Sequence, residues 1–469
     1  MKVIVFGVGN YYRKQKEKLN SFSDIEITAF ADNNISLWDK EIDGKIVISP
    51  DLIQTVEYDK IMIMNIYVGM IYEQLLTLGV DKDKIIIWER FCAESVQGKR
   101  AIFPRKPSTD HLKKSVLIIS AALGYNGGTL AAVYAALSLK QRGISIVLAA
   151  PKGDEKLIEE ITDRKIDVVI WSSLPYIFDT DRIWIQQFEI VIVNTLQMME
   201  CAFQIIKICP MMWWVHEPLE MYAPLMMKYP TYKSKDQLEY LNIYAVSKIA
   251  QENFNQSFNT HGCKKILTLG IPDKVNIVKK RMHDAKIVFA IIGNVYSLKA
   301  QDIFLKAASM LDCKEELEFW IIGKMYHNEY CKNIRKMAFD ISSVKILGEL
   351  DREEIDNLFS DIDVLVCTSL EETLSLTVVE AMMYGKICIT TDTTGVAEYV
   401  RDGVNGFVIP CNNVNALREK MEWIIDNINK LESIKINARK TYEKYFNMDV
   451  FGENLTNALS DIKQEKYKV

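Results

Sequence analysis

The sequence predicts an α/β protein with three successive doubly wound units, each built around a mostly parallel sheet. Short β-branched runs alternate with longer helical patterns along the whole chain, as βαβ units require. At roughly 150 residues per domain, 469 residues have room for about three domains. A polar, basic stretch with two prolines at 96–114 has the composition of a linker between the first two units.

Composition excludes several classes of protein. Apolar residues make up 49% and charged residues 25%, which excludes a disordered chain. The net charge of -5 argues against a nucleic-acid partner, which would favour a basic excess. Nine scattered cysteines without a CxxC pair predict neither a disulfide framework nor a zinc ribbon.

The chain begins with a strand-like run, without a secretory leader, and has no run of 18 apolar residues. We therefore expect a cytoplasmic protein. Segment 224–235 mixes apolar and basic residues, which suits either contact with the inner face of the membrane or a helix and loop packed on the second unit.

The first unit, residues 1–95, is predicted as a Rossmann-like accessory domain. Its expected strands are 2–6, 25–31, 60–65 and 84–88. Gly7 and Gly9 with Asp32 follow part of the dinucleotide fingerprint, but Tyr12 stands where the third glycine belongs. We favour a structural or protein-contact role, including oligomer formation, over nucleotide binding.

The second and third units are predicted at 115–272 and 273–440. The expected strands are 115–120, 145–150, 167–171, 189–194, 211–215 and 243–246, then 286–292, 319–322, 344–347, 363–368, 387–390 and 406–409. Helices are expected near 416–428 and 434–445. Ligands of open α/β sheets bind at the carboxyl ends of the strands, so the functional search belongs where two such sheets face each other.

Two glutamates follow one predicted strand of the third unit. Glu372 lies in the loop after the strand, and Glu380 lies on a helix that begins near Leu376. Carboxylates accept strong hydrogen bonds from sugar hydroxyls, and a helix N-terminus attracts phosphate. The alternative is a solvated acidic loop beside a glutamate on the helix surface.

The sequence around these glutamates, 363–391 with 394–398 and 402–407, resembles the nucleotide-sugar site of retaining GT-B glycosyltransferases of family GT4. The resemblance implies a GT-B fold, two facing Rossmann-like domains, over roughly 115–460. It also implies that Glu372 contacts the transferred sugar and Glu380 the nucleotide ribose. Backbone amides after Glu372 (Leu374, Ser375, Leu376) would contact sugar or phosphate. Segment 441–469 would form a helix that crosses back to the second unit.

A second match, 291–302, places Lys299 on the family's lysine that neutralises the diphosphate leaving group. The family's arginine is Asn294 here, and the glycine after the lysine is Ala300. Gly323 falls where a glycine loop contacts the nucleobase. The alternative for Lys299 is an exposed loop lysine.

On the acceptor side, Gly128 lies in a loop that resembles the family's glycine loop against the donor phosphates. His216 ends a strand, where the family has a histidine at the cleft. The alternatives are that Thr129 merely caps the next helix and that His216 is a hydrogen-bonded core histidine.

Three Asp-x-Asp pairs, at 81/83, 179/181 and 361/363, are interpreted as surface chemistry, and no zinc-ligand spacing occurs. The expected activity is thus retaining, metal-independent transfer from a nucleotide-sugar donor, without a cofactor. The acceptor would be a glycan, lipid-linked saccharide or protein, as in bacterial surface polysaccharide synthesis. Two alternatives stay open: a non-catalytic GT-B partner subunit, favoured by Asn294, and an NDP-sugar epimerase.

Overall fold

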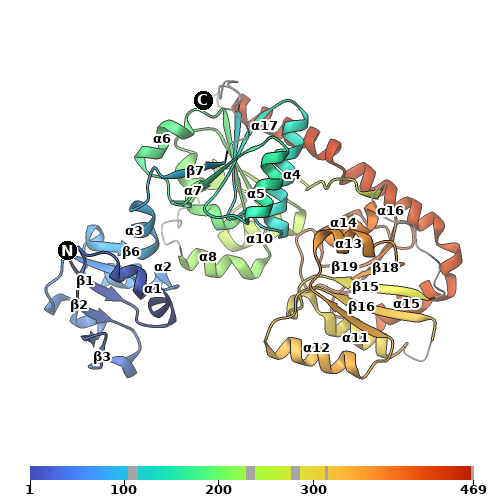
Figure 1. The fold of residues 1–469 in the computed structure, drawn as a ribbon, viewed down its shortest axis with the longest axis horizontal. Helices are drawn as coiled ribbons and strands as arrows, with labels where there is room; N and C mark the ends of the chain where they lie inside the picture. The colour runs from blue at the N-terminus through green and yellow to red at the C-terminus, as the bar shows by residue number, and fades with distance from the viewer. Residues whose placement is uncertain (104–114, 229–237, 276–285, 312–314, 466–469) are drawn as a thin grey trace.

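Three sheets form the framework of the protein, one in each predicted unit (Figure 1). The computed structural model describes residues 1–103, 115–228, 238–275, 286–311 and 315–465. The α/β prediction is confirmed, because parallel strand pairs dominate all three sheets. Among the described residues, no helix combines the length and apolar character needed to cross a membrane.

The first sheet has six strands in the order β3-β4-β2-β1-β5-β6. Only the short β3–β4 pair is antiparallel. Its strands are β1 (Lys2–Phe6), β2 (Glu26–Ala31), β3 (Glu41–Ile42), β4 (Lys45–Ile48), β5 (Lys60–Ile63) and β6 (Ile85–Ile87), and its helices are α1 (Asn10–Asn20), α2 (Val68–Thr77) and α3 (Trp88–Glu94). Asp32 does not present a free carboxylate, because its two oxygens accept hydrogen bonds from the backbone N–H groups of Val8 and Asn34. This use of Asp32 is structural.

The second sheet has eight strands in the order β14-β13-β12-β11-β8-β9-β10-β7. Its strands are β7 (Arg100–Phe103), β8 (Ser115–Ile119), β9 (Ser145–Ala150), β10 (Asp167–Trp171), β11 (Ile190–Asn194), β12 (Met211–Val215), β13 (Asn242–Ala245) and β14 (Lys265–Ile266). The helices of this unit are α4 (Gly127–Gln141), α5 (Glu155–Asp163), α6 (Asp179–Ile185), α7 (Met199–Ile205), α8 (Tyr222–Lys228) and α10 (Lys248–Phe258). The strands β8, β11 and β12 are buried at every position, as expected of a sheet covered on both faces.

One correction concerns the predicted linker at 96–114. Arg100–Phe103 forms β7, which pairs antiparallel with β10 at the edge of the second sheet. The physical reason is the Arg100 side chain, whose guanidinium lies over the rings of Trp171 and Trp184 and pairs with the fully buried Asp181. Residues 104–114 of the linker lie outside the described residues, as do residues 229–235 of the predicted membrane-contact segment.

The third sheet has six parallel strands in the order β17-β16-β15-β18-β19-β20. Its strands are β15 (Ile287–Ile292), β16 (Leu317–Ile322), β17 (Val344–Gly348), β18 (Val364–Cys367), β19 (Ile387–Thr391) and β20 (Phe407–Ile409). The helices are α11 (Gln301–Ser309), α12 (Glu329–Phe339), α13 (Arg352–Leu358), α14 (Leu376–Met383), α15 (Val414–Asn427) and α16 (Glu432–Tyr445). The switch in strand order between β15 and β18 leaves the ligand crevice that such sheets form at their carboxyl ends.

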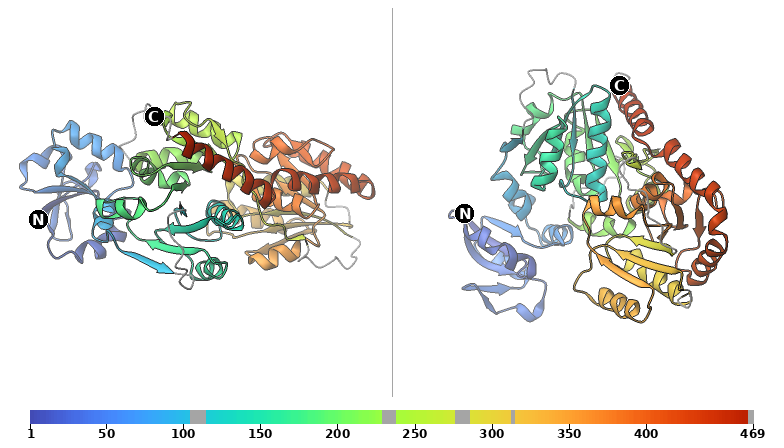
Figure 2. Two further views of the ribbon diagram at one scale, coloured as in Figure 1. Left: turned by 90° about the horizontal axis from the view of Figure 1, so that it is seen from above. Right: turned by 45° about the vertical axis from the view of Figure 1, so that its right-hand side comes forward.

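The last helix, α17 (Met448–Glu465), leaves the third unit and lies along α4 of the second (Figure 2). Arg142, which follows the last residue of α4, donates to the Asp449 carbonyl, and Lys463 pairs with Glu189 near the other end of α17. At the start of this crossing, Ile271 bridges to Asn447, and the Tyr442 hydroxyl donates to the Ile271 carbonyl. The second and third units are therefore joined by two adjacent passages of chain.

Candidate active site between the second and third units

An ion pair lies at the carboxyl ends of β15 and β18. Lys299 Nζ is 2.7 Å from Glu372 Oε1, and both side chains are about one-fifth exposed (21% and 20%). Glu372 Oε2 accepts a hydrogen bond from Ser369 Oγ at 3.0 Å. Burial lowers the pKa of Lys299, but the Glu372 carboxylate outweighs it and holds that pKa above its ordinary value. The lysine is therefore a fixed positive charge at neutral pH.

The backbone around this pair is tightly folded. Ala300, where the family has glycine, adopts a left-handed φ of 49° between Lys299 and α11. The strand ends carrying Gly293 and Gly323 are in contact: a Cβ on Gly323 would lie 2.0 Å from the Gly293 carbonyl oxygen. Asn294, at the family's arginine position, is exposed and donates to the Tyr326 hydroxyl. Because Asn294 is uncharged, it adds no positive charge to that of Lys299.

The turn that starts α14 follows Glu372. Leu374 is buried, and Ser375 has a left-handed φ of 42° just before Leu376 opens the helix. Across from it, a Cβ on Gly127 would lie 3.6 Å from the Leu376 side chain. The glycine loop of the second unit therefore faces the N-terminus of α14, where a helix favours an anion.

His216, at the end of β12, belongs to a hydrogen-bond chain of the second unit. Its Nε2 is 2.9 Å from Asn194 Oδ1, and Asn194 Nδ2 donates to the Gly128 carbonyl at 2.8 Å. Burial lowers the pKa of His216 to about 3, so the ring is neutral. Because the Asn194 oxygen must accept from Nε2, this network assigns the proton to Nε2 and leaves Nδ1 as an acceptor. Asn126, rather than Thr129, caps α4 by accepting from the Thr129 N–H.

Two residues beside Glu372 join the units directly. Glu371 Oε1 accepts from the Leu219 N–H and from Asn253 Nδ2, both at 2.7 Å. Thr373 Oγ1 donates to the His216 carbonyl at 2.6 Å. These contacts set the loop that carries Glu372 against the backbone at His216, at the junction between the second and third units. This junction, where open α/β sheets are expected to bind ligands, is called the cleft.

Glu380 lies deeper than Glu372. Its side chain is 4% exposed and pairs with Arg352 of α13, a residue that sequence reasoning did not single out. Burial raises the pKa of Glu380, while Arg352 opposes that shift. Arg352 also approaches Asp356 on its own helix. In this structure the Glu380 carboxylate is therefore occupied by a guanidinium, and its predicted contact with a ribose needs Arg352 to share or leave it.

Sequence reasoning brought together Lys299, Glu372, His216 and Gly128, and the structure places all four around this cleft. It missed Asn194, Glu371 and Arg352. Asn194 could have been found, because a polar residue ending an apolar strand marks the functional edge of a sheet. Arg352 gave no local signal, because its partner is 28 residues away. Among the described residues, no three His, Cys, Asp or Glu side chains are grouped to hold a metal ion.

Comparison with protein families adds two matches. Residues 273–441 match the family described as glycosyl transferases group 1, a stretch that contains Lys299, Glu372 and Glu380. Residues 1–86 match a family described as C2185-like, N-terminal. Each family covers less than half of the chain.

Individual relatives are distant. A GDP-mannose-dependent monoacylated α-(1-6)-phosphatidylinositol monomannoside mannosyltransferase of Corynebacterium glutamicum is 22% identical over 48% of this chain and 62% of its own length. An N,N'-diacetylbacillosaminyl-diphospho-undecaprenol α-1,3-N-acetylgalactosaminyltransferase of Campylobacter jejuni is 25% identical over 34% of this chain and 39% of its own. The chain thus spans less than two thirds of the length of either relative.

Solved structures establish the fold. HepE of Anabaena, in complex with UDP and glucose, superposes with a TM-score of 0.60 at 18% identity and covers 74% of this chain and all of its own. TarM superposes with a TM-score of 0.58 at 11% identity over 74% of this chain and 98% of its own. The second and third units form a GT-B fold, as the sequence predicts.

Proposed function

We propose that this protein is a glycosyltransferase that moves a sugar from a nucleotide-sugar donor to an acceptor held by the second unit. The observation that carries the proposal is the Lys299–Glu372 pair, set in the cleft between two GT-B units. The match of residues 273–441 to group 1 glycosyl transferases supports it. The UDP and glucose bound by the structural neighbour HepE support a nucleotide-sugar donor.

The pair suits group transfer because one lysine ammonium can donate hydrogen bonds to two different oxygen-bearing groups at once. A lysine ammonium has three N–H donors. One holds Glu372, and the others are available to a phosphate oxygen of the leaving diphosphate. Fixed positive charge at a departing anion lowers the transition-state barrier without reorganisation. Glu372 would meanwhile accept from a hydroxyl of the transferred sugar. We expect no metal requirement, since Lys299 and the start of α14 supply the compensating charge.

His216 contributes as a neutral group. Its Nδ1, which forms no hydrogen bond within the described chain, can accept from a sugar hydroxyl at the cleft. We propose a retaining reaction in which the acceptor hydroxyl attacks the face that the diphosphate leaves. The leaving phosphate oxygen takes the hydroxyl proton, so a second catalytic carboxylate is not needed.

The acceptor we propose is a saccharide, free or lipid-linked, because both curated relatives above are named for lipid-linked acceptors. A role in surface polysaccharide synthesis is part of the proposal.

The test is a screen of purified full-length protein against UDP-, GDP-, ADP- and dTDP-sugars, with release of free nucleoside diphosphate by transfer of the sugar to water or to an added saccharide as the readout. The wild-type protein should release nucleoside diphosphate from at least one donor in the presence of a metal chelator. The Glu372→Gln variant should lose this release, while Glu419→Gln, an exposed glutamate of α15, should keep it. Absence of turnover with all donors would refute the proposal and favour a sugar-binding partner subunit, the alternative that Asn294 supports.

A further inference from the structure

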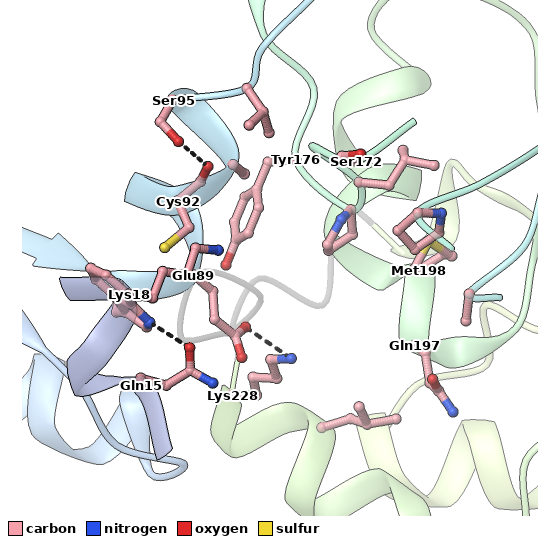
Figure 3. A pocket seen from close by; sticks show the side chains of 18 of the residues that line it. Gln15, Lys18, Glu89, Cys92, Ser95, Ser172, Tyr176, Gln197, Met198 and Lys228 are labelled. Atoms are coloured by element: carbon pink, nitrogen blue, oxygen red, sulfur yellow. Dashed lines mark hydrogen bonds and ion pairs between the residues drawn. The ribbon is translucent and has the colours of Figure 1, made fainter. Parts of the chain in front are cut away.

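A cavity lies between the accessory unit and the second unit, apart from the cleft (Figure 3). Its volume is about 490 Å³. Small-molecule sites range from about 300 to 1,000 Å³, so the cavity has room for a ligand of saccharide size. None of the residues that carry the proposed transfer lines it.

The cavity opens at the functional edge of the second sheet. Ala121, Ser172 and Gln197, which line it, follow β8, β10 and β11 at their carboxyl ends. Ala121 comes directly after Ser120, whose hydroxyl accepts from Asn194, the residue that holds His216. The cavity thus begins one residue away from the hydrogen-bond chain of the cleft.

The opposite wall comes from α1 and α3 of the accessory unit. Gln15, Trp88, Glu89 and Cys92 line this side. Tyr176 from the second unit reaches toward α3, while Gln197 lies across the cavity (Figure 3). An ion pair of 2.9 Å between Glu89 and Lys228 of α8 holds the two walls together.

The lining has the chemistry of saccharide recognition. The half-buried ring of Tyr11 can pack against a C–H face of a sugar, whereas the rings of Trp88 and Tyr176 are only 2% and 5% exposed and border the cavity from within the protein. Amides offer paired donors and acceptors for the sugar hydroxyls. Gln15 accepts from Trp88 Nε1 at 3.4 Å, which leaves its amide N–H₂ without a partner among the described residues. Gln197 is exposed and forms no side-chain hydrogen bond within the described chain. These two amides are therefore available to a ligand in the cavity.

We propose that this cavity binds the non-reacting end of a saccharide acceptor, and that the accessory unit therefore forms part of the acceptor site. The identification of the bound saccharide as the acceptor rests on the proposed function, but the binding of a saccharide in this cavity does not. The reacting end of the saccharide would extend past Ala121 toward His216. The accessory unit then sets which acceptors fit, whereas the third unit sets the donor.

The test uses the full chain and a mixture of defined di- and trisaccharides of neutral, N-acetylated and uronic types. Saturation-transfer NMR should detect binding of at least one of them. The double variant Gln15→Ala/Gln197→Ala should weaken that binding about tenfold, the loss expected for two hydrogen bonds of roughly 0.7 kcal/mol each. The control variant Gln187→Ala changes an exposed glutamine of the second unit and should bind the saccharide as the wild type does. Binding by none of the saccharides, or equal binding by the double variant, would overturn the inference.

Cys92 gives a second readout that needs no mutation. The bound saccharide should slow the alkylation of Cys92 by iodoacetamide, measured by peptide mass spectrometry. It should not slow the alkylation of Cys411, a half-buried cysteine of the third unit. Unchanged alkylation of Cys92 would place the saccharide elsewhere and overturn the inference. Release of nucleoside diphosphate with water as the acceptor of the sugar separates the two hypotheses. It should persist in the double variant, and the absence of release in wild type, with water or with saccharides, would refute the proposed function alone.

Discussion

Replacing Lys299 by alanine removes the side-chain cation that pairs with Glu372. The pair is 2.7 Å apart and about four-fifths buried, so solvent and salt screen it little. Asn294 supplies no second charge. Removing one preorganised group from a developing anion costs about 10²- to 10³-fold in kcat. Because the diphosphate gains charge as the glycosidic bond breaks, we expect kcat to fall by this amount in Lys299→Ala.

The assay measures the steady-state rate of nucleoside diphosphate release from the donor that the wild type turns over. KM should change by less than about threefold, since the lost interaction strengthens only in the transition state. Lys306→Ala removes a half-exposed lysine that pairs with Asp302 on α11 and should leave both constants unchanged. A kcat within threefold of wild type, or a loss confined to KM, would refute the role given to Lys299.

Three further outcomes follow from the same contacts. Burial raises the pKa of Glu217 to about 7 from 4.5 and lowers the pKa of His216 to about 3 from 6.5. The stability that Glu217 contributes is therefore lost as the pH rises toward 7. The stability that His216 contributes is lost as the pH falls below 6.5. In Glu217→Gln only the His216 effect remains, so acidification from pH 6.5 to 5 should lower the free energy of unfolding by up to about 1.4 kcal/mol per pH unit more than in wild type, measured by urea denaturation. Arg352→Ala leaves the Glu380 carboxylate buried and should lower the free energy of unfolding by about 3 kcal/mol at pH 7, seen as a lower urea midpoint. Gly395→Ala would set a Cβ 1.9 Å from a carbonyl oxygen of the Glu372 loop, and the displacement should lower nucleotide release about 100-fold.

Matched variants separate these effects from general damage. Arg418→Ala removes a surface pair with Glu422 on α15 and should cost less than about 0.5 kcal/mol. Gly9→Ala adds a Cβ that meets no atom within 4 Å and should keep full activity. If Glu217→Gln and wild type respond equally to acidification, the opposed titration of Glu217 and His216 is wrong. If Arg352→Ala unfolds no earlier than Arg418→Ala, the Arg352–Glu380 pair does not stabilise the fold.

The strands of the sheets were predictable because each is a short apolar run bounded by turn residues, and the observed bounds of β9, β10 and β12 agree residue by residue. Arg100–Phe103 was predicted as linker because its polar, proline-containing surroundings carry no strand signal. That strand forms through a tertiary contact, the Arg100 guanidinium between two tryptophan rings, which no local pattern encodes.

The candidate site was predictable to the same extent. Lys299 and Glu372 stand in motifs that match a known family, so their proximity could be expected before the structure. The Arg352–Glu380 pair could not, because it depends on how α13 packs against α14. The role of Asp32 was also beyond local pattern, since only the fold shows that backbone N–H groups occupy both carboxylate oxygens.

The double passage of chain beside Ile271 restricts how the two halves of the GT-B fold can separate. Because two segments of the chain are bound side by side here, we expect this point to act as a pivot, so that any opening of the two units is a rotation about it. Gly270 keeps the pivot thin, because a Cβ there would lie 2.5 Å from the Phe451 Cβ and 2.6 Å from the Asn447 carbonyl oxygen. We therefore expect the donor to enter, and the product to leave, on the side of the cleft that lies farthest from this pivot.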